Sequence, residues 1–115
     1  MKKYLLWLLC IFSVNVYSAT EKDMISKSIS GDYDTQRDLA YSYSTGWGKQ
    51  GDNDYVPLNP VYACAWRKVI ILTNTSKIGD SDYNNESIDC KKVPSNANGT
   101  VWKVVFAVLQ ETHNK

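Results

Sequence analysis

Residues 31–71 read GDYDTQRDLAYSYSTGWGKQGDNDYVPLNPVYACAWRKVII, and their pattern predicts two helices joined by a polar loop. The first helix begins after Asp32 or Asp34, because aspartate is a preferred N-cap residue. It ends at Gly46, which suits the left-handed conformation that closes many helices. Its buried face recurs at helical spacing and consists of Leu39, Ala40 and Tyr43, with Gln36 one turn earlier.

The second helix is predicted over residues 61–72. Asn59 and Pro60 precede it as an N-cap residue and a first-turn proline. The β-branched run 69–71 also suits a strand, but the upstream proline and the cysteine spacing favour a helix. The apolar face of this helix is Ala63, Trp66, Val69 and Ile70.

The polar loop, residues 49–59, reads KQGDNDYVPLN and is rich in turn formers. Its acidic run, residues 52–54, resembles part of a calcium-binding loop. However, no glycine stands at the sixth position of that pattern and no acid at the twelfth. We therefore expect a solvated loop and no metal site.

The flanking segments predict three more helices, over residues 22–30, 84–93 and 101–111. Thr100 is expected to cap the last of these, which is β-branched enough for a strand to remain an alternative. A polar link, residues 73–83, precedes the second of them, whose apolar residues are Ile88 and Val93. The predicted fold class is therefore a small all-α domain around one helical hairpin, with the flanking helices covering it.

A basic start, an apolar run and small residues follow one another over residues 1–19, in the order of a secretory signal peptide. Cleavage is expected after Ser18 or Ala19, and an uncleaved anchor is the alternative. Lipidation at Cys10 is rejected because Leu9 precedes it, where a small residue is needed. The mature chain is then one domain, residues 20–115, in the periplasm or secreted.

The mature chain would carry 11 basic residues against 12 acidic ones, since two lysines leave with the signal. A near-neutral exported domain without a basic stripe excludes nucleic acid as the expected partner. No long apolar segment remains, so no membrane span is predicted after cleavage.

Cys64 and Cys90 are the cysteines left after removal of the signal, and they predict a disulfide. The loop that they close holds about 26 residues, for which the chain-entropy estimate is about 3–4 kcal/mol. A reactive or metal-binding pair is the alternative. It is disfavoured because the chain has no CxxC motif and its only histidine, His113, lies near the C-terminus.

The pattern GDxxxQxxLAxxYxxGxG, residues 31–48, resembles the first half of a Sel-one-like repeat, a relative of the tetratricopeptide repeat. Pro57 and the YAxxW pattern of residues 62–66 are similar to its second half. The resemblance implies two antiparallel helices locked by small and apolar residues. The loop here is several residues longer than is usual in that family, and Ile70 and Ile71 stand where it often has alanine. One repeat cannot bury its own faces, so flanking helices must cap it.

No residue pattern points to catalysis. A serine or cysteine nucleophile needs an adjacent base, and the acidic residues show no spacing that singles out a pair. The chain carries no phosphate loop and no dinucleotide fingerprint. We therefore expect a protein that is not an enzyme and has no cofactor, although an enzyme of unrecognised type is the third hypothesis.

The leading functional hypothesis is a periplasmic module that binds another protein, because helical-hairpin repeats present grooved surfaces. By analogy of family and size, the partner is a toxin delivered by a type VI or contact-dependent system, and the chain is its immunity protein. A structural or adaptor role in an envelope complex is the alternative. The aromatic residues in and just after the first helix could pack the hairpin or bind a partner: packing is favoured for Tyr43 and Trp47, whereas the choice is left open for Tyr33 and Tyr41. The expected partner-binding residues lie near the loop, with an inert solvated loop as the alternative: Tyr41, Trp47, Asp52, Asp54 and Tyr55.

Overall fold

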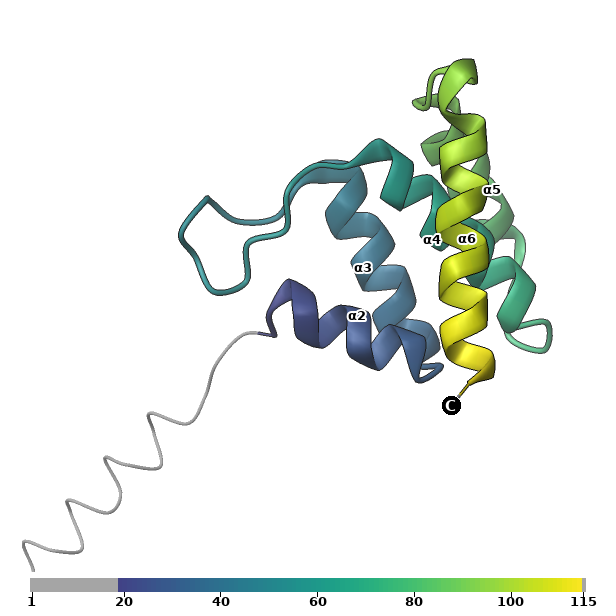
Figure 1. Cartoon of the computed structure of the whole chain (residues 1–115), viewed down its shortest axis with the longest axis horizontal. Coiled ribbons are helices and arrows are strands. Elements are labelled where there is room, and N and C mark those ends of the chain that lie inside the picture. Colours follow the sequence, from purple (N-terminus) through teal and green to yellow (C-terminus); the bar gives the residue numbers. More distant parts are fainter. Residues whose placement is uncertain (1–18, 115) are drawn as a thin grey trace, which may run out of the picture.

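The computed structural model describes residues 19–114, and this part of the chain is all-α (Figure 1). Five α-helices and one 3-10 turn follow in order: α2 (Glu21–Ile29), α3 (Tyr33–Thr45), α4 (Pro60–Thr73), α5 (Asp80–Lys91), η1 (Ser95–Ala97) and α6 (Asn98–His113). The predicted fold class is confirmed, and the strand alternatives for 69–71 and for the last helix are wrong. Of the predicted signal sequence, residues 1–19, residues 1–18 lie outside the described residues.

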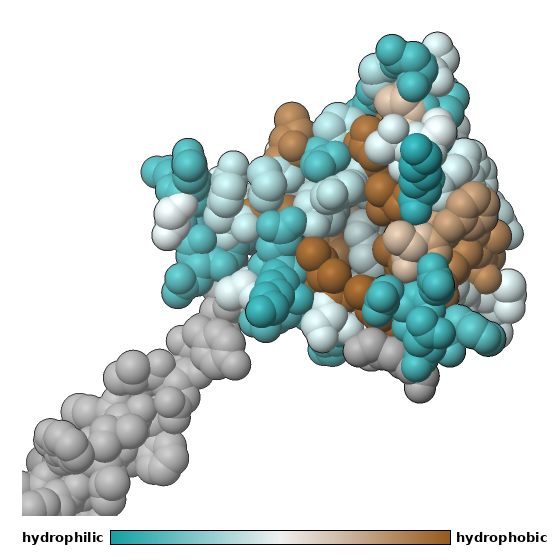
Figure 2. Space-filling model, in the orientation of Figure 1, coloured by the Kyte–Doolittle hydropathy of each residue, from teal (hydrophilic) through white to brown (hydrophobic). Residues whose placement is uncertain are grey.

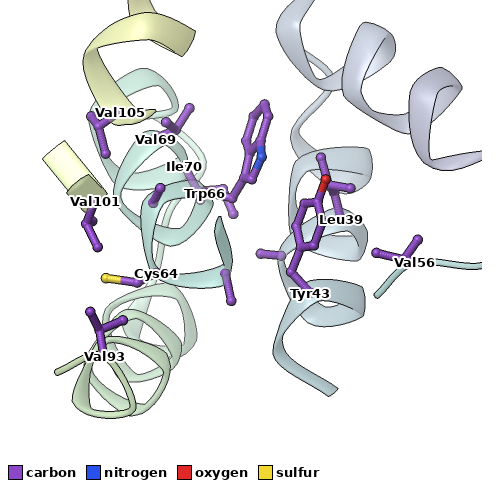
Figure 3. Close-up of a cluster of buried hydrophobic side chains, with 13 residues drawn as sticks. Leu39, Tyr43, Val56, Cys64, Trp66, Val69, Ile70, Val93, Val101 and Val105 are labelled. Atoms are coloured by element: carbon purple, nitrogen blue, oxygen red, sulfur yellow. The ribbon is translucent and has the colours of Figure 1, made fainter. Parts of the chain in front are cut away.

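Helices α3 and α4 pack against each other and form the hairpin, with the loop between them extending away from the domain (Figure 1). Helix α2 covers α3, whereas α5 and α6 both pack on α4. In Figure 3, Leu39 and Tyr43 of α3 face the side chain of Trp66 on α4, and Val101 and Val105 of α6 approach α4 from its other side. The flanking helices thus bury the two faces that a lone hairpin leaves open.

Caps set the starts of the first helices. Thr20 and Asp23 form a reciprocal capping box at α2, and the Asp32 carboxylate accepts a hydrogen bond from the backbone N–H of Thr35. The Thr35 hydroxyl also donates to Asp32, and these hydrogen bonds lower the pKa of the Asp32 carboxyl. At α4 the Asn59 side chain accepts from Tyr62. Asp32 and Asn59 therefore act as the sequence predicts.

Gly46 ends α3, but not in the predicted left-handed helical conformation. Its φ of 77° is positive, as expected, whereas its ψ of 143° is extended. The extended ψ directs the chain out of the helix and into a pair of backbone hydrogen bonds between Trp47 and Val56. The glycine is required for its positive φ, but it launches an extended segment instead of a compact helix stop.

Two predicted helix starts are wrong. Helix α5 begins at Asp80, four residues before the predicted start, because the Asp82 carboxylate accepts the backbone N–H of Gly79 and closes a first turn. Helix α6 begins at Asn98, directly after the 3-10 turn, so Thr100 lies inside the helix and does not cap it.

The face of α5 that packs on the domain is acidic. Asp82, Glu86 and Asp89 lie four and three residues apart and so share one side of the helix. Asp82 and Asp89 are buried, whereas Ile88 is 55% exposed. Ile88, an apolar residue of the predicted helix, therefore lies outside the packed face, where ionic contacts take the place of an apolar stripe.

Asp82 joins α5 to the start of α3. Its carboxylate accepts the hydroxyl hydrogen bond of Tyr33, and Arg37 Nε lies 3.3 Å from Oδ1 in an ion pair without hydrogen-bond geometry. The Arg37 guanidinium also stacks over the Tyr33 ring at 5.4 Å. The carboxylate of Asp82 raises the pKa of the Tyr33 hydroxyl, and partial burial adds to that rise.

Asp89 joins α5 to α4 and to the end of α3. It accepts hydrogen bonds from Arg67 Nε at 2.8 Å and from Ser44 Oγ at 2.7 Å. Lys92 Nζ lies 3.9 Å away at the surface. A buried carboxylate with a buried guanidinium and a hydroxyl satisfies the requirement that interior charges be paired.

Covalent and surface contacts complete the attachment of α5. Cys64 of α4 and Cys90 of α5 form the predicted disulfide, with Cα atoms 4.7 Å apart. Lys68 and Glu86 pair on the surface at 2.7 Å.

The buried polar residues of α3 and α4 are linked by hydrogen bonds. Gln36 donates to the carbonyl oxygen of Ser28 on α2, at 2.9 Å, and accepts from Asn74 at the end of α4, at 2.8 Å. At the other end of the hairpin, the Tyr43 hydroxyl donates to Glu21. Burial, together with the Glu21 carboxylate, raises the pKa of Tyr43 above its ordinary value.

None of the helices within residues 19–114 combines the length and the apolar character needed to cross a membrane.

Candidate partner-binding site

The loop between α3 and α4, residues 46–59, is bridged by hydrogen bonds within the loop itself. Trp47 and Val56 exchange two backbone hydrogen bonds, at 2.9 and 2.8 Å, and so close the base of the loop. At its tip, the Asp52 carboxylate accepts the backbone N–H of Lys49 at 3.0 Å. Gly48 has a φ of 73°, which disfavours other residues there. We call residues 46–59 the projecting loop, because they extend away from the helices (Figure 1).

A pocket of about 390 Å³ lies where the projecting loop meets α3 and α2. Its floor and walls combine two aromatic rings, two carboxylates and a thioether. We call it the Trp47 pocket, and it is lined by Ala19, Met24, Asp38, Tyr41, Ser42, Trp47 and Asp54. A volume near the lower end of the ~300–1,000 Å³ range of ligand sites suits one large side chain better than a cofactor.

The Trp47 pocket is acidic, because it contains Asp38 and Asp54 and no lysine, arginine or histidine among its lining residues. Trp47 Nε1 donates to Asp54 Oδ2 at 3.0 Å, and this hydrogen bond orients the indole ring relative to the Asp54 carboxylate. Asp38 makes no hydrogen bond or ion pair with any residue between 19 and 114 that would neutralise it.

The structure brings three of the five predicted residues together, since Tyr41, Trp47 and Asp54 all line this pocket. The side chains of Tyr41 and Trp47 are 53% and 50% exposed, so Trp47 is not buried in hairpin packing as the sequence favoured, whereas Tyr43 is. Asp52 stabilises the loop tip, and Tyr55 lies half-buried outside the pocket.

Sequence reasoning missed Asp38 and Met24. Asp38 precedes Tyr41 by three residues on α3, so helical spacing alone places the two side chains on neighbouring positions. Met24 comes from α2, and nothing in the sequence indicates that α2 packs beside the loop.

A second pocket, of about 350 Å³, lies on the other side of Tyr41, between α3, α4 and α5. We call it the Arg67 pocket, and it is lined by Asp34, Arg37, Asp38, Tyr41, Arg67 and Asn85. Tyr41 and Asp38 line both pockets and form the ridge between them. The two pockets thus adjoin each other, and the lining of the Trp47 pocket is mainly apolar whereas that of the Arg67 pocket is mainly polar.

Another exposed surface lies on α6, where the rings of Trp102 and Phe106 are 5.9 Å apart and Lys68 Nζ lies 4.9 Å from the Trp102 ring. Figure 2 shows hydrophobic surface over α6, whereas the projecting loop is largely hydrophilic. The two surfaces therefore differ in chemistry.

The described residues contain no group of three metal-ligating side chains. His113 stands exposed in the last turn of α6, and no nucleophile hydrogen-bonded to a histidine occurs within residues 19–114.

Comparison with protein-family models, with curated proteins and with solved structures found no match to this chain.

Proposed function

We propose that this chain is an exported protein-binding module of the periplasm, and that it binds its partner through the Trp47 pocket and the projecting loop. The observation that carries the proposal is the convergence of Tyr41, Trp47 and Asp54 on one pocket at the base of a braced loop. Half-exposed aromatic rings beside a concavity are typical of the anchors of protein interfaces. The resemblance of residues 31–66 to a Sel-one-like repeat supports the same use.

Within this class, we propose that the partner is an antibacterial toxin acting in the periplasm, so that the chain serves as its immunity protein. The leader-like residues 1–19, the disulfide and the small size of the domain support this role. A braced loop also fits an inhibitor, because a loop held in its bound conformation loses little entropy on binding.

The test is a protection assay with the exported gene products encoded next to this chain. Each is directed to the periplasm of a bacterial host with and without this protein, and host survival is measured. We expect one neighbour to be lethal alone and harmless with the protein. If no neighbour is both lethal and neutralised, the immunity role is wrong.

Binding to that neighbour then tests the surface. Trp47→Ala is expected to weaken affinity by about 30-fold or more, the loss typical of a tryptophan hot spot. Trp102→Ala is the matched control, since it removes an exposed tryptophan from α6, and it should leave the affinity unchanged. Equal losses in the two variants would place the interface elsewhere.

A further inference from the structure

We propose that the Trp47 pocket takes a lysine or arginine side chain of the partner, while a backbone carbonyl of the same partner segment accepts hydrogen bonds from Arg67 across Tyr41. This inference rests on the proposed function and names the chemistry that the partner must present. Two independent features carry it, the charge of the Trp47 pocket and the free donors of Arg67.

The first feature is charge complementarity. Asp38 and Asp54 are acceptor-only carboxylates, and no lysine, arginine or histidine lines the pocket with them. Signal cleavage would add one cation beside them, the new amino terminus at Ala19 or Thr20, and this single charge leaves the pocket with a net negative charge. An apolar side chain placed here would strip water from two carboxylates without replacing its hydrogen bonds, which is unfavourable. An acidic side chain would add like-charge repulsion. A cationic side chain satisfies both carboxylates.

The aromatic walls favour the same occupant. The faces of tryptophan and tyrosine attract lysine and arginine cations, by about 0.5–1 kcal/mol at exposed sites. Met24 and the ring of Tyr41 offer apolar surface to the methylene stem of such a side chain, whose charged head stays with the carboxylates. The hydrogen bond from Trp47 Nε1 to Asp54 holds one ring and one carboxylate together before the partner arrives.

The second feature is Arg67, whose side chain is only 6% exposed although it lines the Arg67 pocket. Its Nε donates to Asp89, but its two terminal nitrogens make no hydrogen bond within residues 19–114. Both nitrogens keep some exposure to solvent, and Arg67 is a lining residue of the pocket. A guanidinium with spare donors and so little exposure is oriented toward a ligand acceptor.

The acceptor is a neutral carbonyl and not a carboxylate or phosphate. Asp89 already neutralises Arg67, and Asp82 pairs with Arg37. Asp34 and Asp38 add two further negative charges to the lining of the same pocket. An anion would meet this surplus of negative charge, whereas a peptide carbonyl accepts hydrogen bonds without it.

The two pockets share Tyr41 and Asp38, so a single extended segment crossing Tyr41 reaches both. The basic side chain of the segment anchors it in the Trp47 pocket. The partner carbonyl that accepts hydrogen bonds from Arg67 sets the direction in which the segment runs. An isolated side-chain cation would occupy the Trp47 pocket alone.

The test uses the protein exported to and purified from the bacterial periplasm. It is titrated with acetylated and amidated tripeptides Gly-X-Gly, where X is arginine, lysine, glutamate or norleucine. Side-chain N–H signals of Trp47 and of Arg67 Nε are followed by nuclear magnetic resonance. We expect saturable shifts of both signals with the arginine and lysine peptides, at least about threefold weaker binding of the other two, and no shift of Trp66 or Trp102.

Two controls separate the parts of the proposal. Asp38→Asn is expected to weaken binding of the arginine peptide about two- to fivefold, the ratio for loss of an exposed ion pair. Glu111→Gln makes the same change of charge on α6 and should leave binding unchanged. Ethylguanidinium, which has no carbonyl group, should shift Trp47 and leave Arg67 unmoved.

The basic-side-chain assignment is overturned if no peptide gives a saturable shift, if glutamate or norleucine peptides bind as well, or if the Asp38 and Glu111 variants behave alike. The Arg67 assignment is overturned if the arginine peptide leaves its signal unmoved or ethylguanidinium shifts it equally. If the protein binds a toxin through Trp47 but binds none of the peptides, this inference is wrong and the proposed function is still supported. If the peptides bind as expected but the protein protects against no neighbouring gene product, the immunity role is wrong and this inference is still supported.

Discussion

Replacing Asp89 with asparagine is expected to remove much of the stability of this domain. Asp89 is 4% exposed, and its carboxylate is the partner of the equally enclosed Arg67 at 2.8 Å. Asparagine has almost the same shape, so the change leaves packing intact and removes the charge that compensates the guanidinium. It also weakens the hydrogen bond from Ser44 that ties α5 to the end of α3.

Removing one partner of a buried ion pair costs about 3–5 kcal/mol, because the other charge stays enclosed and unpaired. A domain of this size has a free energy of unfolding of about 5–14 kcal/mol. The variant should therefore lose about a fifth or more of the total free energy of unfolding, measured by urea unfolding followed by circular dichroism, with an unchanged slope. Asp80→Asn at the exposed start of α5 is the matched control, and its loss should stay below about 1 kcal/mol.

The double variant Asp89→Asn with Arg67→Met decides whether the pair is the cause. Once the guanidinium is gone, the uncompensated charge is gone as well, so the double variant should be more stable than Asp89→Asn alone. The reasoning that the Asp89–Arg67 ion pair attaches α5 would be refuted by either of two results. One is a double variant whose loss of stability equals the sum of the two single losses, and the other is a loss below about 1 kcal/mol for Asp89→Asn.

Three further perturbations test other parts of the fold. Replacing Cys64 and Cys90 together with alanine should lower the free energy of unfolding by about 3–4 kcal/mol, since the bridge spans a sequence separation of 26. Two free thiols in protein purified from the periplasm would contradict the disulfide. Gly46→Ala should cost about 1–2 kcal/mol because its φ is 77°, whereas Gly99→Ala within α6 should be neutral or stabilising by up to ~1 kcal/mol. Equal effects would mean that the positive φ is not required. The raised pKa of Tyr43 makes the unfolded chain release its proton first, near the ordinary value of 10.0, so stability holds below about pH 9 and falls above pH 10. Tyr43→Phe should flatten that alkaline fall, and an unchanged slope would exclude Tyr43 as its source.

The hairpin was predictable from sequence because its local signals agree. Asp32 and Asn59 are strong caps, Pro60 suits a first turn, and the apolar residues of both helices recur at helical spacing. If the predicted signal sequence and its Cys10 are removed, Cys64 and Cys90 leave one pairing, so the disulfide followed from counting the remaining cysteines.

The existence of α5 was predicted, but its packed face could not be predicted, because periodicity arguments assume that the buried face of a helix is apolar. Its buried face carries Asp82 and Asp89, and no rule of sequence alone pairs them with Arg37 and Arg67. Orienting the helix so that Ile88 faces the core therefore places its acidic, buried side in solvent.

The candidate site, like the fold, was predictable from the sequence only in part. Tyr41, Trp47 and Asp54 were chosen as residues expected to be exposed near a polar loop, and composition alone is enough for that choice. The pocket itself depends on where α2 packs and on the Trp47–Val56 bridge, which are tertiary features. The donors of Arg67 were hidden from the sequence reading because an arginine in the middle of an apolar helix gives no sign of which way its nitrogens point.

Arg67 connects the stability of the fold with the proposed recognition. Its Nε donates to Asp89 of α5, and this bond orients the guanidinium group of a side chain that also lines the Arg67 pocket. Asp89 is therefore a positioning residue for the pocket as well as a structural one. In a folded Asp89→Asn variant, the Trp47 signal should still respond to the arginine peptide, because Asp38 and Asp54 are untouched. The response of Arg67 should fall, because its plane is no longer fixed by a charge-assisted bond. A variant in which both responses survive intact would show that the ion pair holds the helix without orienting the donors.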